Sequence, residues 1–358
     1  MTYALSATCI IAVLLVSFLV VRQRDPKLRT QRLARVRAKG QQAMQACLWD
    51  KAVRHYAHAS RLAVGAELAD AHRQTGVCRQ AQGRLGEAEA SFAEAAKAAD
   101  QCGDRVTKAS ALRGLGLVRQ RRGDHSKALA YYEQSIALSH ELGDRLGEAA
   151  AYSNTGLLWK TANELDRALD CFRQALSLFQ ELGARPQLAS VLGNIALVHM
   201  DREEFDSALE HLNQTLDIAR QIGDRRTEAN ALGNIASVHL AQHLPNEALA
   251  GYEKLLEVHR EMGDPDGEAR DRVGIGDTLV RKGDYETAAG YLTQALKAFL
   301  KLEIADGPRK CLTGLRMCLT VMGVKDFSAA CEKAKLEPRT VTELIKVLEL
   351  RQPQRAGR

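Results

Sequence analysis

Residues 143–182 read GDRLGEAAAYSNTGLLWKTANELDRALDCFRQALSLFQEL. The first half predicts a helix over about 146–161, in which Gly156 lets a neighbouring helix approach closely. In the second half, apolar residues follow the i, i+3, i+4, i+7 spacing of one helical face: Leu165, Ala168, Leu169, Phe172, Ala175, Leu176, Phe179 and Leu182. The stretch therefore predicts two helices joined as a hairpin.

This pattern repeats every 40 residues, which is the most informative feature of the chain. The markers are Ala88, Ala128, Ala168, Ala208, Ala248 and Ala288. Gly or Ala stands twelve residues before each marker, and Phe, Tyr or Leu stands four residues after it. Pairs such as Gly143 and Asp144 supply a residue with positive φ and a cap for the next helix. With an earlier copy around Gly40, we expect seven hairpins.

The repeat resembles the tetratricopeptide repeat (TPR) family over about residues 33–302. The shared markers are a small residue at the eighth position, Ala at the twentieth, and an aromatic residue or Leu at the twenty-fourth. The 40-residue period and the string YSNTG at 152–156 resemble the LGN/Pins-type adaptors, although the Pro that usually ends the motif is missing. The resemblance implies an all-α fold, a superhelical solenoid of about seven helical hairpins.

Past residue 302 the repeat pattern decays. Ser328 and Glu332 stand where Ala and an aromatic residue are expected, but residues 308–322, 326–336 and 339–350 still predict helices. A solenoid needs a terminal element with a polar outer face. We therefore expect a helical cap over 303–350 and a frayed tail over 351–358.

The N-terminus predicts a membrane anchor over residues 1–21. Residues 3–21 carry no charge, and as a helix they would span about 28 Å, close to the hydrocarbon thickness. A cleaved signal peptide is the alternative, but no basic residue precedes the apolar run and no small-residue cleavage pattern follows it. Basic residues nearest the anchor are Arg22, Arg24, Lys27 and Arg29. Under the positive-inside rule they predict that the repeats face the cytosol.

The net charge of +6 is concentrated in the juxtamembrane segment 22–39, where eight basic residues face a single acidic one. The remainder of the chain is not basic, which argues against nucleic-acid binding. The eight cysteines show no CxxC spacing and predict free thiols in a reducing compartment. His55 and His58 lack a third ligand with metal spacing. We expect no catalytic residue, metal or cofactor.

Stacked hairpins leave a concave groove lined by the first helix of each pair. The same position of this helix carries Asn154, Asn194 and Asn234 in three consecutive copies. A side-chain amide both donates and accepts, so the three predict a ladder along an extended peptide. In LGN-like proteins the matching asparagines hold the partner's backbone, and the resemblance implies this role here. The alternative is that each Asn only caps or packs within its own helix.

Cations complete the predicted groove: Arg73, Arg113, Arg121, Lys160 and Arg281. Arg73 and Arg113 favour an acidic patch on the ligand, because guanidinium groups bind carboxylates in a bidentate manner. Solvated surface charge is the competing interpretation.

These features together predict a membrane-anchored, non-catalytic TPR adaptor or scaffold that binds peptides or partner proteins in its groove. Two alternatives stay open. One is a chaperone-docking or import receptor of the kind found in the outer mitochondrial membrane, which also combines a short anchor with TPRs. The other is a scaffold that self-associates into a homo-oligomer through its terminal repeats.

Overall fold

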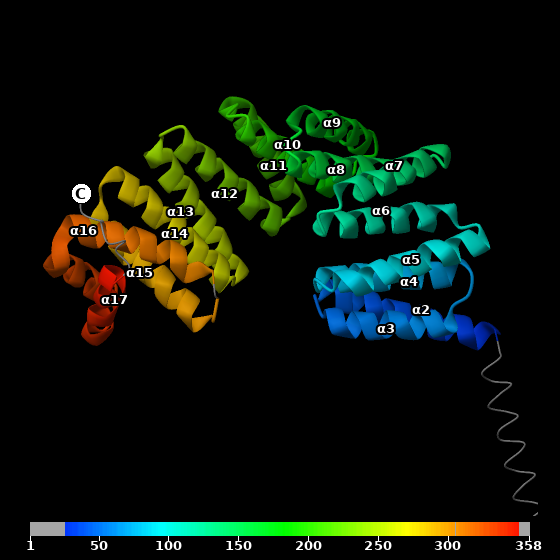
Figure 1. Cartoon of the computed structure of the whole chain (residues 1–358), viewed down its shortest axis with the longest axis horizontal. Coiled ribbons are helices and arrows are strands. Elements are labelled where there is room, and N and C mark those ends of the chain that lie inside the picture. The colour runs from blue at the N-terminus through cyan, green and yellow to red at the C-terminus, as the bar shows by residue number, and fades with distance from the viewer. Residues whose placement is uncertain (1–25, 305, 351–358) are drawn as a thin grey trace, which may run out of the picture. The chain divides into compact units, whose positions relative to one another are not determined.

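The computed structural model describes residues 26–304 and 306–350 (Figure 1). Within these residues the chain forms sixteen α-helices and no strand. The prediction of an all-helical array of hairpins is therefore confirmed. The chain divides into two compact units, Met1–Leu182 and Gly183–Arg358, called here the N-terminal and the C-terminal unit.

The described part of the N-terminal unit is a stack of four hairpins (Figure 1). They are α2 (Pro26–Gln45) with α3 (Trp49–Leu62), α4 (Ala66–Ala81) with α5 (Leu85–Cys102), α6 (Arg105–Arg121) with α7 (His125–Glu141), and α8 (Arg145–Thr161) with α9 (Leu165–Glu181). Because α2 begins at Pro26, residues 26–39 of the basic segment lie in the first helix of the first hairpin. There Arg29 Nε donates to the Leu62 carbonyl at 2.5 Å, so this predicted anchor-flank residue is tied into the hairpin.

The described part of the C-terminal unit contains three hairpins and two further helices. They are α10 (Arg185–Asp201) with α11 (Phe205–Ile222), α12 (Arg225–Ala241) with α13 (Pro245–Met262), α14 (Pro265–Lys282) with α15 (Tyr285–Lys301), then α16 (Gly307–Lys333) and α17 (Pro338–Leu350). Gly323, with φ 76° and ψ 168°, breaks α16 into two helical pieces. The break explains why the sequence predicts two helices in this stretch.

A small residue packed against a large one holds each hairpin together, as the pair in the fourth hairpin illustrates. A Cβ atom added to Gly156 would lie 2.6 Å from Cε1 of Phe172, which is fully buried. In the next hairpin Ala196 and Leu212 occupy these two places, and both are fully buried. The small and large residues that recur every 40 positions are therefore in direct contact and join the two helices of a hairpin.

The turns inside successive hairpins share one backbone conformation. Asn163, Glu203 and His243 each take a positive φ, of 62°, 59° and 59°. Gly123 and Gly283 hold the corresponding places in other hairpins, with φ of 77° and 83°. Side chains with a Cβ atom are strained in this left-handed region, whereas glycine enters it freely.

Replacing the strained residues should stabilise the C-terminal unit. We expect Glu203→Gly and His243→Gly each to raise the free energy of unfolding by about 0.5–1 kcal/mol, since relief of strain exceeds the added entropy of the unfolded chain. Thermal unfolding followed by circular dichroism measures the change. Gly123→Ala is the reverse control and should lower the melting temperature. A lower melting temperature in both glycine variants would contradict the strain argument.

The predicted transmembrane segment 1–21, its neighbours Arg22 and Arg24, and the tail 351–358 lie outside the described residues. Among the helices from α2 to α17, all are too short or too polar to cross a bilayer.

Candidate functional site

Several first helices pack directly against the first helix of the next hairpin, or against α16, within each unit. In the N-terminal unit α4 contacts α6, and α6 contacts α8. In the C-terminal unit α10 contacts α12, and α14 contacts α16. Such contacts are expected on the inner side of a curved stack. The first helices therefore carry the candidate binding residues.

A cavity of about 290 Å³ lies between α10 and α12, with α11 beneath it. Three asparagines line this cavity: Asn194 from α10, and Asn230 and Asn234 from α12. It is called here the amide pocket. Its remaining lining residues are Ala189, Ser190, Gly193, Leu197, Leu212, Thr215, Thr227 and Ala231. Two of the asparagines that recur in the sequence therefore share one site.

The pocket amides keep their hydrogen-bonding capacity for a ligand. Within the described residues, the side chains of Asn194, Asn230 and Asn234 make no hydrogen bond to the protein, and all three are at least partly exposed. Each amide offers two donor hydrogens and an acceptor oxygen. Asparagine is also a poor residue for a helix interior, so helix stability does not account for three of them here.

Asn230 is not predicted by the repeat, because it lies outside the repeating Asn position. Asn230 and Asn234 are four residues apart on α12 and share a helical face, which is the signal that could have identified it. The third predicted amide, Asn154, is half-buried on α8 of the N-terminal unit. The predicted ladder of three is thus divided between two units, with two members in the amide pocket.

Two of the predicted groove cations are bound within the protein. Arg73 Nη2 lies 2.6 Å from Asp70 Oδ1, and Arg37 lies 2.6 Å from the other oxygen of the same carboxylate. Arg113 Nη1 donates to the Gly147 carbonyl at 3.3 Å, and burial lowers the pKa of its guanidinium group. The Arg37 and Arg113 contacts link neighbouring hairpins, whereas the Arg73 contact lies within α4, so both predicted cations already have partners inside the protein.

The other predicted cations lie near the ends of first helices. Arg121 Nη1 donates to the Gln80 carbonyl at 3.4 Å, and Lys160 is half-buried at the end of α8. Arg281 is exposed at the end of α14. Its positive charge acts on Asp277, a half-buried carboxylate on the same helix.

Burial raises the pKa of Asp277, and the opposing effects of Arg281 and Lys310 are smaller. A raised pKa means that the folded state binds a proton more readily than the unfolded state. The ionised carboxylate therefore lowers stability at neutral pH, and this cost disappears as the pH falls through the folded pKa towards 3.8, the ordinary value.

We expect Asp277→Asn to be more stable than the wild type at pH 7 by about 0.5 kcal/mol, a small effect because solvent screens a half-buried charge. The advantage should shrink as the pH approaches 4. Urea unfolding at both pH values measures it, with Glu253→Gln on the exposed face of α13 as the control. An Asp277→Asn advantage that grows towards acid pH would contradict the assigned direction of the pKa shift.

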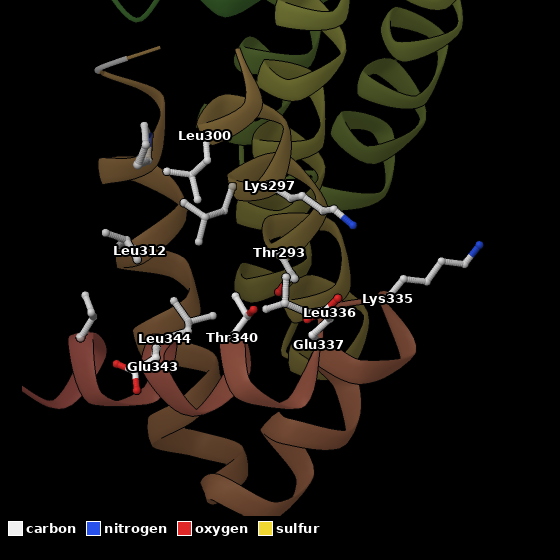
Figure 2. A pocket seen from close by; sticks show the side chains of 13 residues that line it. Thr293, Lys297, Leu300, Leu312, Lys335, Leu336, Glu337, Thr340, Glu343 and Leu344 are labelled. Atoms are coloured by element: carbon white, nitrogen blue, oxygen red, sulfur yellow. The ribbon is translucent and has the colours of Figure 1, made fainter. Parts of the chain in front are cut away.

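A larger groove of about 620 Å³ lies where α17 crosses α15 and α16 (Figure 2). It is lined mainly by apolar side chains, among them Leu296, Leu300, Leu312, Leu336, Leu344 and Val347. Lys297 and Lys335 extend from one margin (Figure 2). None of the residues that line the groove carries a side-chain amide, whereas the amide pocket has three, each able to donate to and accept from an extended backbone.

The described cysteines are free thiols, and several are buried. Burial raises the pKa of Cys311 to about 12, and those of Cys78 and Cys318 to about 11. These thiols are therefore protonated at neutral pH, and a protonated thiol is a weak nucleophile. In residues 26–304 and 306–350, no three His, Cys, Asp or Glu side chains are grouped so that they could hold a metal ion.

Stacked hairpins with hydrogen-bonding groups on their first helices define an α-helical repeat protein. A family model of the tetratricopeptide repeat matches residues 66–141, 107–181, 187–250 and 227–301, which together make up more than half of the chain. This chain belongs to the tetratricopeptide repeat family. No curated protein sequence matches it.

Several solved structures share the fold. The apo form of RapI has a TM-score of 0.66 and 13% identity, over 86% of this chain and 85% of RapI. The STAND protein with a TPR sensor, PH0952 from Pyrococcus horikoshii, has a TM-score of 0.65 and 14% identity, over 83% of this chain and 46% of PH0952. A Rap protein complexed with competence and sporulation factor has a TM-score of 0.54 and 13% identity, over 90% of this chain and 99% of that protein. At these identities the likeness shows the fold alone.

Proposed function

We propose that this protein is a non-catalytic adaptor whose C-terminal unit binds an extended segment of a partner protein across the first helices α10 and α12. Asn194 and Asn234 hold the backbone of that segment by donating to its carbonyl groups and accepting from its amide groups. The carrying observation is that these side chains, together with Asn230, surround one cavity without any hydrogen bond to the described protein.

One solved structure and the resemblance drawn from the sequence support this proposal. A Rap protein of the same fold is complexed with competence and sporulation factor, so in that protein the fold accommodates a ligand. The resemblance to LGN/Pins-type adaptors, in which matching asparagines hold the partner's backbone, favours the same role for Asn194 and Asn234. One side-chain amide can pair with both the carbonyl and the amide of a peptide group, whatever the side chains beside it.

The test is binding of the full chain to a displayed library of random peptides, followed by affinity measurement on the selected peptides. Removing both amides in an Asn194→Ala/Asn234→Ala variant should weaken binding by about 10- to 100-fold, because each lost pair of hydrogen bonds contributes about 1 kcal/mol. The matched control is Asn213→Ala. Asn213 is exposed on the outer helix α11 of the same unit, so its removal should leave affinity unchanged.

Two results would reject the proposed function. One is that the wild-type chain enriches no peptide over the unselected library. The other is that the double variant binds the selected peptides as tightly as the Asn213→Ala control. Circular dichroism must show equal helicity in all three proteins, so that weaker binding reports the lost amides and not unfolding.

We also propose that residues 1–21 anchor the protein in a membrane, with the repeats on the cytosolic side. The uncharged run of residues 3–21 and the basic residues that follow it support this location. Sedimentation with membranes after alkaline extraction, compared between the full chain and a chain lacking residues 1–21, tests the anchor. Release of the full chain into the soluble fraction would reject it. Protease added to sealed vesicles tests the orientation.

A further inference from the structure

One residue that lines the amide pocket, Gly193, has no side chain. A Cβ atom added there would have Thr215, at 3.9 Å, as its nearest neighbour, which is ordinary van der Waals distance. In the N-terminal unit the corresponding positions carry Arg73, Arg113 and Ser153. The space between α10 and α12 is therefore open to a side chain that comes from the ligand.

The lining of this space is uncharged. None of the eleven residues around the pocket is acidic or basic. The nearby carboxylate of Asp224 accepts from the backbone and hydroxyl of Thr227, and buried Glu228 is paired with Arg220 and Arg225. A charged ligand side chain would lose water here without finding a free opposite charge, and that loss costs free energy.

The polar and apolar groups are arranged for a side chain with an apolar stem and a neutral polar head. Half-buried Leu197 provides apolar surface within the pocket, while Asn194, Asn230 and Asn234 provide donors and acceptors. A primary amide matches such neighbours, since it too both donates and accepts. A hydrocarbon side chain would fill the space but leave the Asn230 amide unpaired by the ligand, because Asn194 and Asn234 pair with the ligand backbone.

We propose that the amide pocket selects a glutamine or asparagine side chain in the bound segment. The inference rests on the proposed function, because it names the side chain that enters the site while Asn194 and Asn234 hold the backbone. Asn230, which lies one helical turn before Asn234, is assigned to the head group of the inserted side chain.

The test uses the full chain and the peptides selected by it. The selected sequences should share Gln or Asn at one position, and replacing this residue by Glu, Lys or Leu should weaken binding about tenfold, the loss of one to two hydrogen bonds. In a Gly193→Leu variant the leucine occupies the pocket, so the same replacements should change affinity less than twofold. Gly290→Leu is the matched control. An added Cβ at Gly290 on α15 meets no atom within 4 Å, and the wild-type preference should persist there.

An exchange of charge provides a second readout. Asn230→Asp places a carboxylate in the pocket, and library selection with this variant should shift the shared position from Gln or Asn to Lys or Arg. Gly193→Leu and Asn230→Asp should each keep the wild-type melting temperature within a few degrees, because neither new side chain is forced against tightly packed atoms.

The outcomes separate this inference from the function on which it rests. If peptides bind and lose affinity in Asn194→Ala/Asn234→Ala, yet show no Gln or Asn preference, the adaptor function stands and the pocket inference is overturned. The pocket inference is also overturned if the Gln or Asn preference persists in Gly193→Leu, or if Asn230→Asp selects the same residues as the wild type. Failure to select any peptide rejects the proposed function itself.

Discussion

Gly156→Leu should destabilise the N-terminal unit by about 3 kcal/mol, because a side chain would be forced into space that Phe172 already fills. The Cβ atom alone would lie 2.6 Å from the Phe172 ring, and that ring is fully buried and has nowhere to move. Urea unfolding monitored by circular dichroism measures the loss. The variant should also expose its N-terminal unit to limited proteolysis before the C-terminal unit.

The identical substitution at another inner-helix glycine is the control. Gly193→Leu meets no atom closer than 3.9 Å at the added Cβ, so it should be tolerated. Removing the obstructing ring in Gly156→Leu/Phe172→Ala should recover part of the lost stability, although Phe172→Ala alone costs about 3–5 kcal/mol. If Gly156→Leu and Gly193→Leu prove equally stable, the account of the small and large pairs is wrong.

Arg220→Ala/Arg225→Ala should cost the C-terminal unit about 2–3 kcal/mol, because it leaves a buried carboxylate without a cation. Glu228 is only 4% exposed, and its two oxygens lie 2.9 Å from Arg220 Nε and 2.6 Å from Arg225 Nη1. We place the loss below the usual range for a buried pair since both guanidinium groups reach solvent. Thermal and urea unfolding at neutral pH measure it.

The repeat itself supplies the control for this second prediction. Leu188 occupies the place of Glu228 one repeat earlier, so the position accepts an apolar side chain. Glu228→Leu in the Arg220→Ala/Arg225→Ala background should therefore restore most of the stability. If the unpaired charge of Glu228 does not cause the loss of stability, adding Glu228→Leu will not make Arg220→Ala/Arg225→Ala more stable.

The hairpins could be predicted from the sequence because the information that specifies them is local and repeated. Apolar spacing along 165–182 specifies a helical face, and each small residue twelve positions before a marker alanine specifies where the partner helix packs. The two pieces of α16 were also predicted, since helices were expected over 308–322 and 326–336, on either side of Gly323. Contacts between residues that lie close in sequence need no knowledge of the rest of the structure.

The candidate site could be predicted only in part, because it depends on contacts between repeats. The recurrence of Asn194 and Asn234 put them on one face, but the pocket also needs Thr215 from α11 and the missing side chain at Gly193. The guanidinium group of Arg73 looked available in the sequence, yet Asp70 three residues earlier binds it. Periodicity identifies equivalent positions and does not reveal which partners occupy them.

The shared turn conformation at Glu203 and His243 bears on how this protein could have changed in length. Excising residues 204–243 would join two backbone ends that already have the same conformation, so the flanking helices would meet in their native direction. Inserting a further 40 residues at the same point would extend the array just as simply. Genes encoding such a chain can gain or lose one module at a time, and each event adds or removes a binding position while the others persist.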